Sequence, residues 1–291
     1  MFKKYKPYLF LAPASILFLI FVIIPIFYTF YLSFFEWNMI SPVKEFVGIK
    51  NYLQVLSDPN IYKITFNTLF YIILMALFNF GGAYIFAFVC KYILTKYQKL
   101  YKITLFLPGF ISLIVTSMIF VWILNPLTGP VSYIFEILGF VMPKWSTTEG
   151  LIIVVISLIT SWGCFGYNFI TLFAAISNVP QSVIEAARLD GIPLTKIFFK
   201  IVIPMSSSSG YYILITTMMQ ALSNVFGPID VITGGGPDYA SSNLIYEAFY
   251  QAFTVFETGT SATISILTML FFTILVYVLN RTIGKKVYYA N

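Results

Sequence analysis

Histidine is absent from this 291-residue sequence, and charged side chains make up only 10% of it. The absence of histidine excludes His-ligated metal sites, His proton relays and Ser–His or Cys–His catalytic pairs. An ordinary soluble domain has about 25% charged residues, so this chain lacks the polar surface that a soluble enzyme or a nucleic-acid-binding protein needs. Its two cysteines, Cys90 and Cys164, both lie in apolar runs, which predicts buried thiols and no disulfide framework.

Apolar side chains fill the sequence instead, since 59% of it is hydrophobic and it contains 31 Phe and 21 Tyr. A helix needs about 20 apolar residues to cross a hydrocarbon core of about 30 Å. Six stretches meet this requirement, and none of them contains Asp, Glu, Lys or Arg. We predict an all-α membrane protein, a single domain over residues 1–291 whose six transmembrane helices lie at about 9–34, 66–90, 103–124, 151–176, 205–229 and 258–280.

The distribution of charge predicts the orientation of this bundle. With the N-terminus in the cytoplasm, the inner segments hold thirteen of the 17 Lys and Arg residues, and the outer segments hold four. Among the 11 acidic residues only Glu185 and Asp190 fall inside. Because cytoplasmic loops carry the excess of basic residues, we expect a multi-pass protein of the cell membrane with both termini in the cytoplasm.

The segment 178–204 joins the fourth and fifth predicted spans on the cytoplasmic side. Pro180 suits a first helical turn, Gly191 suits the left-handed residue after a helix, and Pro193 begins a second helix that Pro204 ends. The sequence therefore predicts a helix, a turn and a helix. Composition leaves two interpretations of the first helix open: a lid packed on the protein's own helix ends, or a docking knob whose small Ala186–Ala187 pair lets a partner approach closely.

The spacing within this segment resembles the EAA loop of bacterial ABC importer permeases, in which EAA is followed by three residues, G, nine residues and I-x-L-P. The only departure is Ile203 in place of Leu. The resemblance implies a type I permease fold whose first loop helix sits in a cleft of a cytoplasmic ATPase subunit. The residues that it assigns to ATPase coupling are Glu185, Ala186, Ala187, Gly191, Ile201 and Pro204.

The same resemblance implies the partners and cofactors. They are a second permease subunit, expected to be a paralogue, two cytoplasmic ABC ATPase subunits and an extracellular solute-binding protein. ATP and magnesium would bind to the ATPase subunits, so we expect no cofactor, metal or catalytic site on this chain, which would not itself be an enzyme.

A second informative loop lies outside the membrane between the last two predicted spans. It contains Gly234, Gly235, Gly236 and Pro237, and no Lys-Ser/Thr follows, so we expect a close-approach turn rather than a phosphate-binding loop. With the residues that follow, up to Phe253, it looks like a segment of the carbohydrate-importing branch, related to the maltose and glycerol-phosphate permeases. In that branch the outer surface receives the binding protein. Residues 42–59, between the first two spans, indicate an ordinary connecting turn region.

Polar side chains within spans are costly unless they face the bundle interior or water, so they indicate a route for solute. The candidates are Trp162, Tyr167, Asn168, Gln220 and Asn224. No carboxylate or ammonium is among them, which disfavours an ion or proton relay and suits a neutral polyol. Hydrogen bonding between helices is the alternative role for each of them.

Together these features predict the permease subunit of an ATP-driven importer for a sugar, an oligosaccharide or glycoside, working by alternating access. Three alternatives remain. The nearest is a permease of the same architecture for another small solute such as a glycerophosphodiester. A secondary transporter or channel, and a membrane-embedded enzyme, are the others.

Overall fold

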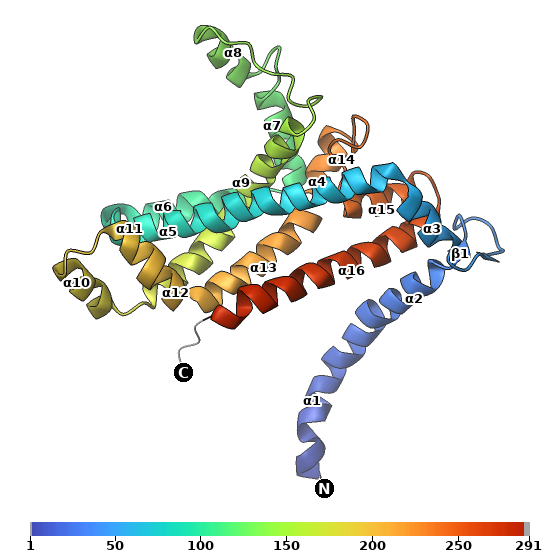
Figure 1. Cartoon of the computed structure of the whole chain (residues 1–291), viewed down its shortest axis with the longest axis horizontal. Helices are drawn as coiled ribbons and strands as arrows, with labels where there is room; N and C mark the ends of the chain where they lie inside the picture. Colours follow the sequence, from blue (N-terminus) through green and yellow to red (C-terminus); the bar gives the residue numbers. More distant parts are fainter. Residues whose placement is uncertain (1, 288–291) are drawn as a thin grey trace. The chain divides into compact units, whose positions relative to one another are not determined.

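The computed structural model describes residues 2–287, and helices account for most of that range (Figure 1). The chain forms two compact units. The first comprises residues up to Ile61 together with Glu247–Phe272, and the second comprises Tyr62–Tyr246 together with residues from Thr273 onward.

The first unit begins with a long apolar helix and continues into a small ordered segment. The helix consists of α1 (Phe2–Phe18), the π-helical η1 (Leu19–Ile23) and α2 (Ile24–Leu32). The remaining elements are β1 (Phe35–Glu36), β2 (Glu45–Phe46), α3 (Lys50–Ser57), most of α15 (Leu244–Phe253) and the first part of α16 (Thr258–Thr282). The two strands pair antiparallel, with Phe35 opposite Phe46 and Glu36 opposite Glu45.

The second unit is built from helices around α9 (Leu151–Ser177). Before α9 come α4 (Pro59–Met75), η2 (Ala76–Gly82, π-helical), α5 (Ala83–Tyr92), η3 (Thr95–Tyr97), α6 (Gln98–Phe106), η4 (Leu107–Phe110), α7 (Leu113–Ile123) and α8 (Pro130–Ile137). After it come α10 (Gln181–Leu189), α11 (Leu194–Ile197), η5 (Phe198–Val202, π-helical), α12 (Ile203–Met205), α13 (Ser207–Ser223) and α14 (Phe226–Ile232). The described chain ends with η6 (Gly284–Lys286).

Within the described residues, four helices are long and apolar enough to cross a membrane, and the number rises to six if each of two bent pairs is one span. The four are Tyr8–Leu32, Pro59–Tyr92, Leu151–Ser177 and Thr258–Thr282. They match the first, second, fourth and sixth predicted spans, with the second beginning seven residues earlier than the expected 66. The remaining two predicted spans correspond to the bent pairs.

The third predicted span, 103–124, corresponds to a bent pair, because the chain bends by 99° between Thr95–Phe110 and Leu113–Ile123. The bend follows Pro108, which has no N–H with which to continue the helical ladder. Ile111 leaves the helix with extended dihedrals, and its N–H is bonded to the Pro108 carbonyl at 3.0 Å. Hydropathy detects the length of an apolar run but not its direction.

The fifth predicted span, 205–229, also differs from the structure. The chain bends by 83° between Leu194–Met205 and Ser207–Ile232. The first of these helices ends at Met205, one residue beyond the predicted end at Pro204. Ser206 forms the corner, where its hydroxyl is hydrogen-bonded to the buried Tyr84 and donates to the Val202 carbonyl at 2.6 Å. The Ser206 N–H keeps its backbone bond to the Val202 carbonyl at 3.0 Å, so the side-chain hydrogen bonds add to the helical ladder at this corner.

Residues 42–59 are more ordered than the expected turn region. They supply β2, helix α3 and the start of α4. Asn51 on α3 is 4% exposed and donates from Nδ2 to the carbonyls of Ser33 at 2.9 Å and Phe35 at 3.0 Å. These bonds tie α3 to the end of α2 and to β1, so the segment is a folded part of the first unit and not only a connection.

The core of the second unit lies where α5 and α9 pack together. Ala83, Ala87, Phe169 and Leu172 are fully buried in it. At Gly166 the approach of α6 is closest, because an added Cβ would lie 2.3 Å from the Leu105 carbonyl oxygen. Only glycine fits this crossing.

The crossing gives a prediction. Replacing Gly166 with Ala should lower the free energy of unfolding by about 1–3 kcal/mol or more, because the methyl group meets backbone that cannot move aside. Thermal unfolding in detergent measures the loss. Gly81→Ala is the matched control, since its Cβ would have 3.8 Å to the nearest atom. Equal melting temperatures for the two variants would contradict the close approach.

Candidate coupling helix and membrane path

Helix α10 packs one of its faces against the core of the second unit. Ile184 and Ala187 on this face are 0% and 5% exposed, within the same hydrophobic cluster as residues of α5 and α9. Arg188 adds a bond from Nη2 to the Tyr92 carbonyl at 3.3 Å. A rotation or shift of α10 therefore has to move the ends of the helices beneath it, because packed cores do not deform continuously.

Gly191 ends this helix as the sequence predicts. Its φ of 70° lies in the left-handed region, where a side chain is strained. The Gly191 N–H bonds to the Arg188 carbonyl and the Ile192 N–H to the Ala187 carbonyl, each at 3.0 Å. This pair of bonds is a Schellman motif, which caps the last carbonyls of the helix and sharply reverses the chain.

The opposite face of α10 is exposed. Glu185 and Ala186 lie on it, and Glu185 accepts a hydrogen bond from Gln181 Nε2 at 3.1 Å. Ala186 and Ala187 consequently point to different surroundings, so the expectation that the pair forms one small-residue patch is wrong. The lid interpretation therefore describes the buried face of α10, and the docking interpretation describes its exposed face.

Leu189 is a feature of this face that the sequence analysis missed. Its side chain is 89% exposed, although it is apolar and adjoins the cap. An isolated exposed leucine is not unusual, but here it extends the uncovered face of α10 formed by Glu185 and Ala186. A partner that docks on this face would contact an apolar side chain, Leu189, beside a polar one, Glu185. The sequence held one signal: Leu189 follows Glu185 by four residues, which places both side chains on the same face of a helix.

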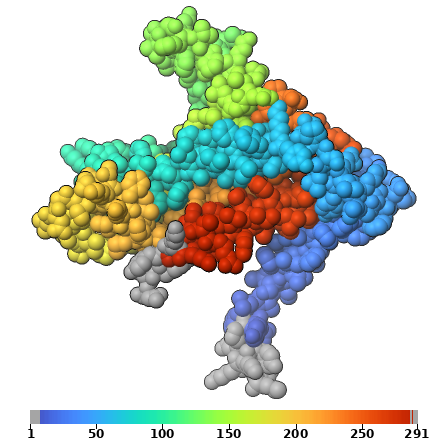
Figure 2. All heavy atoms as spheres, in the orientation of Figure 1, coloured from blue at the N-terminus to red at the C-terminus, as the bar shows by residue number. Residues whose placement is uncertain are grey.

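The second half of the loop rests on the core and exposes its charges. Ile197 and Phe198 are buried, Ile201 is partly buried, and Lys196 and Lys200 are exposed. Pro204, the last residue of the family pattern, is also exposed. A cleft of about 380 Å³ lies beside Gly191 and both lysines. Figure 2 shows the loop, in yellow, as a lobe at one end of the second unit.

Asn168, one of the five predicted path residues, lies at the centre of a hydrogen-bond network. It is fully buried, and its Nδ2 lies 3.1 Å from Thr217 Oγ1, 3.3 Å from the Asn79 carbonyl oxygen and 3.4 Å from Gln220 Oε1. The network joins α9 to η2 and α13. It brings two of the predicted path residues, Asn168 and Gln220, together.

Asn79 belongs to the same network and was missed from the sequence. It is fully buried within η2, and its Nδ2 donates to Ser161 Oγ at 3.1 Å. The side-chain oxygens of Asn79 and Asn168 are both buried without a hydrogen-bond partner. An unpaired buried polar atom costs about 1–3 kcal/mol. An amide in the middle of the apolar run 69–90, followed by Gly81 and Gly82, was the available signal.

The other predicted path residues are less buried. Trp162 is 40% and Tyr167 47% exposed, and the Trp162 ring lies edge-on to Phe120 with centroids 5.5 Å apart. Asn224 is partly buried and contacts Cys164, with 3.2 Å between Nδ2 and Sγ. Of the five residues, Asn168 is therefore fully buried, Gln220 and Asn224 are partly buried, and Trp162 and Tyr167 are exposed.

The glycine-rich loop is tied down by its neighbours, as expected of a close-approach turn. Gly234 and Gly235 have φ of 59° and 84°, and a Cβ on Gly235 would lie 2.9 Å from the Tyr246 ring. Ser241 Oγ donates to the Gly236 carbonyl at 2.8 Å. Gly234 and Pro237 are exposed, so the loop presents a fixed, small-residue surface.

An ion-pair network anchors this loop to two other segments. Lys63 Nζ lies 2.7 Å from Glu149 Oε1 and 3.4 Å from Asp238 Oδ2. The start of α4, the segment before α9 and the glycine-rich loop thus meet at one end of the second unit. Helix α10 follows the other end of α9, so the two predicted contact regions are separated by the length of that helix.

Comparison with known proteins gives matches over most of the chain. Residues 83–288 match the family described as binding-protein-dependent transport system inner membrane component. YurN of Bacillus subtilis, a probable ABC transporter permease protein, is 33% identical over 266 residues, covering 90% of each chain. UgpA of Brucella abortus, a permease protein of an sn-glycerol-3-phosphate transport system, is 29% identical over 289 residues, covering 99% of this chain and 98% of that protein.

A solved structure has the same fold. It is a crystal structure of a bacterial ABC transporter involved in the import of the acidic polysaccharide alginate. The TM-score is 0.82 at 20% identity, with 98% of both chains covered. The all-α permease fold expected from the sequence is therefore confirmed.

The Asn168 network gives a testable coupling energy. A double-mutant cycle of Asn168→Ala with Thr217→Val should show about 0.6–1.7 kcal/mol of interaction in thermal unfolding, the range for hydrogen bonds between membrane helices. Asn168→Ala with Thr216→Val is the control, because the Thr216 hydroxyl bonds within its own helix, to the Tyr212 and Ile213 carbonyls. Additive effects in the first pair would show that the bond contributes nothing.

Proposed function

The chain belongs to the family of binding-protein-dependent transport system inner membrane components, and from this premise we propose that it is a permease subunit of an ATP-driven carbohydrate importer. A second permease subunit, a paralogue, completes the membrane path. Two cytoplasmic ATPase subunits bind ATP and Mg²⁺, and an extracellular binding protein delivers the solute. Both termini and the loop 178–204 face the cytoplasm.

The observation that carries this proposal is the two-sided environment of α10. Ile184 and Ala187 are buried in the bundle core, while Glu185, Ala186 and Leu189 are exposed on the other face. A helix held in this way transmits force from whatever grips its exposed face to the helices under its buried face. The Schellman turn at Gly191 keeps the helix short and fixes the direction of the chain beyond it.

Contact alone couples the motor to the path in this mechanism. Closure of the ATPase subunits around their nucleotide moves α10, and α10 moves the ends of α5 and α9 with which it shares a core. The Asn168 network lies further along α9 and links it to α13 and η2. Alternating access then consists of a shift of these helices that opens a polar path lined by side chains such as Trp162, Gln220 and Asn224.

Carbohydrate is the favoured solute class because the candidate path residues are neutral amides, hydroxyls and aromatic rings. Support also comes from a solved structure of the same fold, a bacterial alginate ABC transporter in complex with an alginate pentasaccharide-bound periplasmic protein. Glycerol phosphate is the second candidate, since UgpA serves an sn-glycerol-3-phosphate system. Competition for uptake between a labelled sugar and sn-glycerol 3-phosphate separates the two candidates.

Substitutions on α10 test the coupling. Gly191→Val should reduce uptake at least tenfold while the protein still inserts into the membrane, because a β-branched residue at φ 70° strains the turn. Gly139→Val is the matched control, since Gly139 also has a positive φ, 78°, and open space at its Cβ position. Uptake and ATP hydrolysis are measured on the assembled transporter in proteoliposomes.

A charge reversal tests the exposed face separately. Glu185→Lys should leave folding intact and uncouple ATP hydrolysis from uptake, whereas Glu136→Lys on α8 should have no effect. Wild-type uptake in both α10 variants would overturn the coupling role. Transport by this chain alone, without ATPase subunits, would instead identify a secondary transporter or channel.

A further inference from the structure

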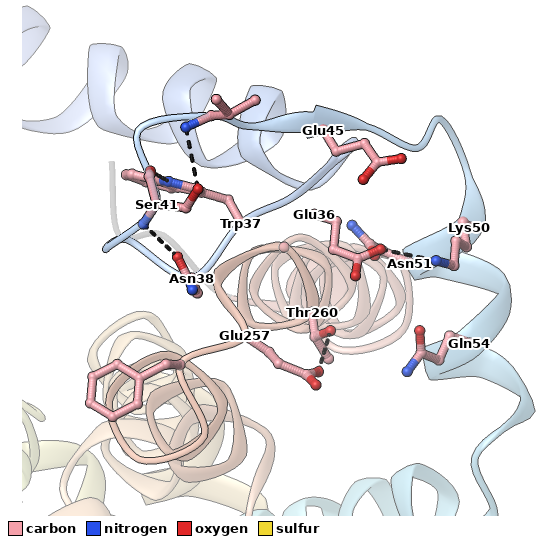
Figure 3. A pocket seen from close by; sticks show the side chains of 13 residues that line it. Glu36, Trp37, Asn38, Ser41, Glu45, Lys50, Asn51, Gln54, Glu257 and Thr260 are labelled. Carbon is pink, nitrogen blue, oxygen red and sulfur yellow. Dashed lines mark hydrogen bonds and ion pairs between the residues drawn. The ribbon is translucent and has the colours of Figure 1, made fainter.

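A preformed pocket lies in the first unit, in the segment that follows the first predicted span. Its volume is about 590 Å³, which falls within the range of about 300–1,000 Å³ for small-molecule sites. The walls come from the β1–β2 hairpin, helix α3 and the first turn of α16 (Figure 3). Neither the coupling helix nor the path residues contribute to it.

Backbone hydrogen bonds fix these walls. Asn51, which lines the pocket, holds the chain at Ser33 and Phe35 as described above. The Thr258 N–H bonds to the Trp37 carbonyl at 2.9 Å. A Cβ on Gly259 would lie 2.0 Å from the Phe35 carbonyl oxygen, so only glycine allows α16 to approach β1 this closely. A ligand that enters such a pocket loses little affinity to ordering the protein.

The lining has the chemistry that a polyhydroxylated molecule requires. Amides come from Asn38 and Gln54, hydroxyls from Ser41 and Thr260, and an indole from Trp37. Amide and hydroxyl groups both donate and accept hydrogen bonds, as do the hydroxyls of a sugar. The Trp37 ring is held by its bond to the Ser41 carbonyl at 2.8 Å, and Lys44 Nζ lies 4.2 Å from the ring centroid. A ligand can therefore contact the part of the Trp37 ring that Lys44 leaves uncovered.

The charges of the lining indicate which kind of polyol fits. Glu36, Glu45 and Glu257 supply three carboxylates, and Lys50 supplies one ammonium group, so the lining carries a net charge of −2. A hydrogen bond to Glu36 at 2.9 Å, and then the attraction of its charge, raise the pKa of Lys50, which keeps the ammonium paired. Glu45 and Glu257 remain to repel an anion.

The hairpin brings two of these carboxylates together. Its register places Glu36 directly opposite Glu45, and like charges at directly opposed positions destabilise a strand pair. Lys50 offsets part of this repulsion, because it pairs with Glu36 and is also attracted by Glu45, and the Phe35 and Phe46 rings pack across the strands with centroids 5.3 Å apart. One ammonium group cannot neutralise three carboxylates, so the lining stays negative.

We propose that this pocket binds a neutral sugar, one without a carboxylate or phosphate group, on the outer side of the permease. The outer location rests on the proposed function, which also supplies the solute class. The charge selectivity rests on the pocket alone. It distinguishes this chain from the systems named for its relatives, which handle glycerol phosphate and an acidic polysaccharide.

Saturation-transfer NMR on the assembled transporter in nanodiscs, without binding protein, tests the proposal. The neutral probes are maltose, sucrose and raffinose, and the anionic probes are galacturonate and sn-glycerol 3-phosphate. At least one neutral probe should receive saturation, and both anions should receive none. Gln54→Trp, which fills the pocket, should reduce the neutral signal at least fivefold. Leu53→Trp is the matched control, because Leu53 is the next residue on α3, is 60% exposed and does not line the pocket.

Removing the charge provides a second readout. The double variant Glu45→Gln and Glu257→Gln should acquire at least fivefold more signal from galacturonate. Glu136→Gln should not change either signal. The proposal is overturned if no neutral probe binds, if Gln54→Trp and Leu53→Trp behave alike, or if the double variant gains no anion signal.

Two further outcomes distinguish the sugar pocket from a protein-docking site and from the proposed function. Loss of binding-protein affinity in Gln54→Trp, without any sugar signal, would mean that the pocket receives a protein side chain, and would overturn the proposal. ATP-independent uptake would defeat the proposed function, yet a neutral-sugar signal lost only in Gln54→Trp would still support the pocket.

Discussion

The burial of Ile184 and Ala187 in the core of the second unit is the interaction that fixes the position of α10. Two small apolar contacts and one bond from Arg188 hold a nine-residue helix against the bundle. An isolated helix of this length is not stable in water, so α10 exists because of what it packs on. Its exposed face is therefore presented in one orientation, and motion imposed on that face would reach the helices of the second unit through this packing and through the chain that continues at Gly191.

Along that route, the chain uses polar side chains where the helical ladder is altered. The π-helical η2 contains Asn79, whose carbonyl oxygen accepts from Asn168, and π-helical turns often mark functional positions. Ser206 and Tyr84 bond across the corner between α12 and α13. Hydrogen bonds between membrane helices are individually weak, about 0.6 kcal/mol on average. Weak, specific contacts suit an element that must exist in two arrangements.

Much of this structure could be predicted from sequence where the signal is local. The left-handed conformation of Gly191 follows from the rule that glycine occupies the residue after a helix end, and four spans follow from apolar length alone. The bends at 107–112 and at Ser206 were not predicted, because a run of apolar residues has the same hydropathy whether the helix is straight or bent. Asn79 was not predicted as a site residue, because its role depends on a hydrogen bond from Asn168, which lies 89 residues later in the chain.

The pocket of the first unit could not be predicted from the sequence either, because its lining comes from segments far apart in the chain. Glu36 and Glu257 are more than 200 residues apart in sequence, and their segments meet where Gly259 approaches the Phe35 carbonyl and the Thr258 N–H bonds to the Trp37 carbonyl. Residues 42–59 have the composition of a turn region, and composition does not reveal that Asn51 ties them to the end of α2. Charged side chains are tolerated in the pocket because water reaches them, whereas a charge at the buried Asn168 would be costly. The proposed pocket is acidic and the proposed path is lined by neutral amides, and an uncharged molecule rich in hydroxyls can form hydrogen bonds in both.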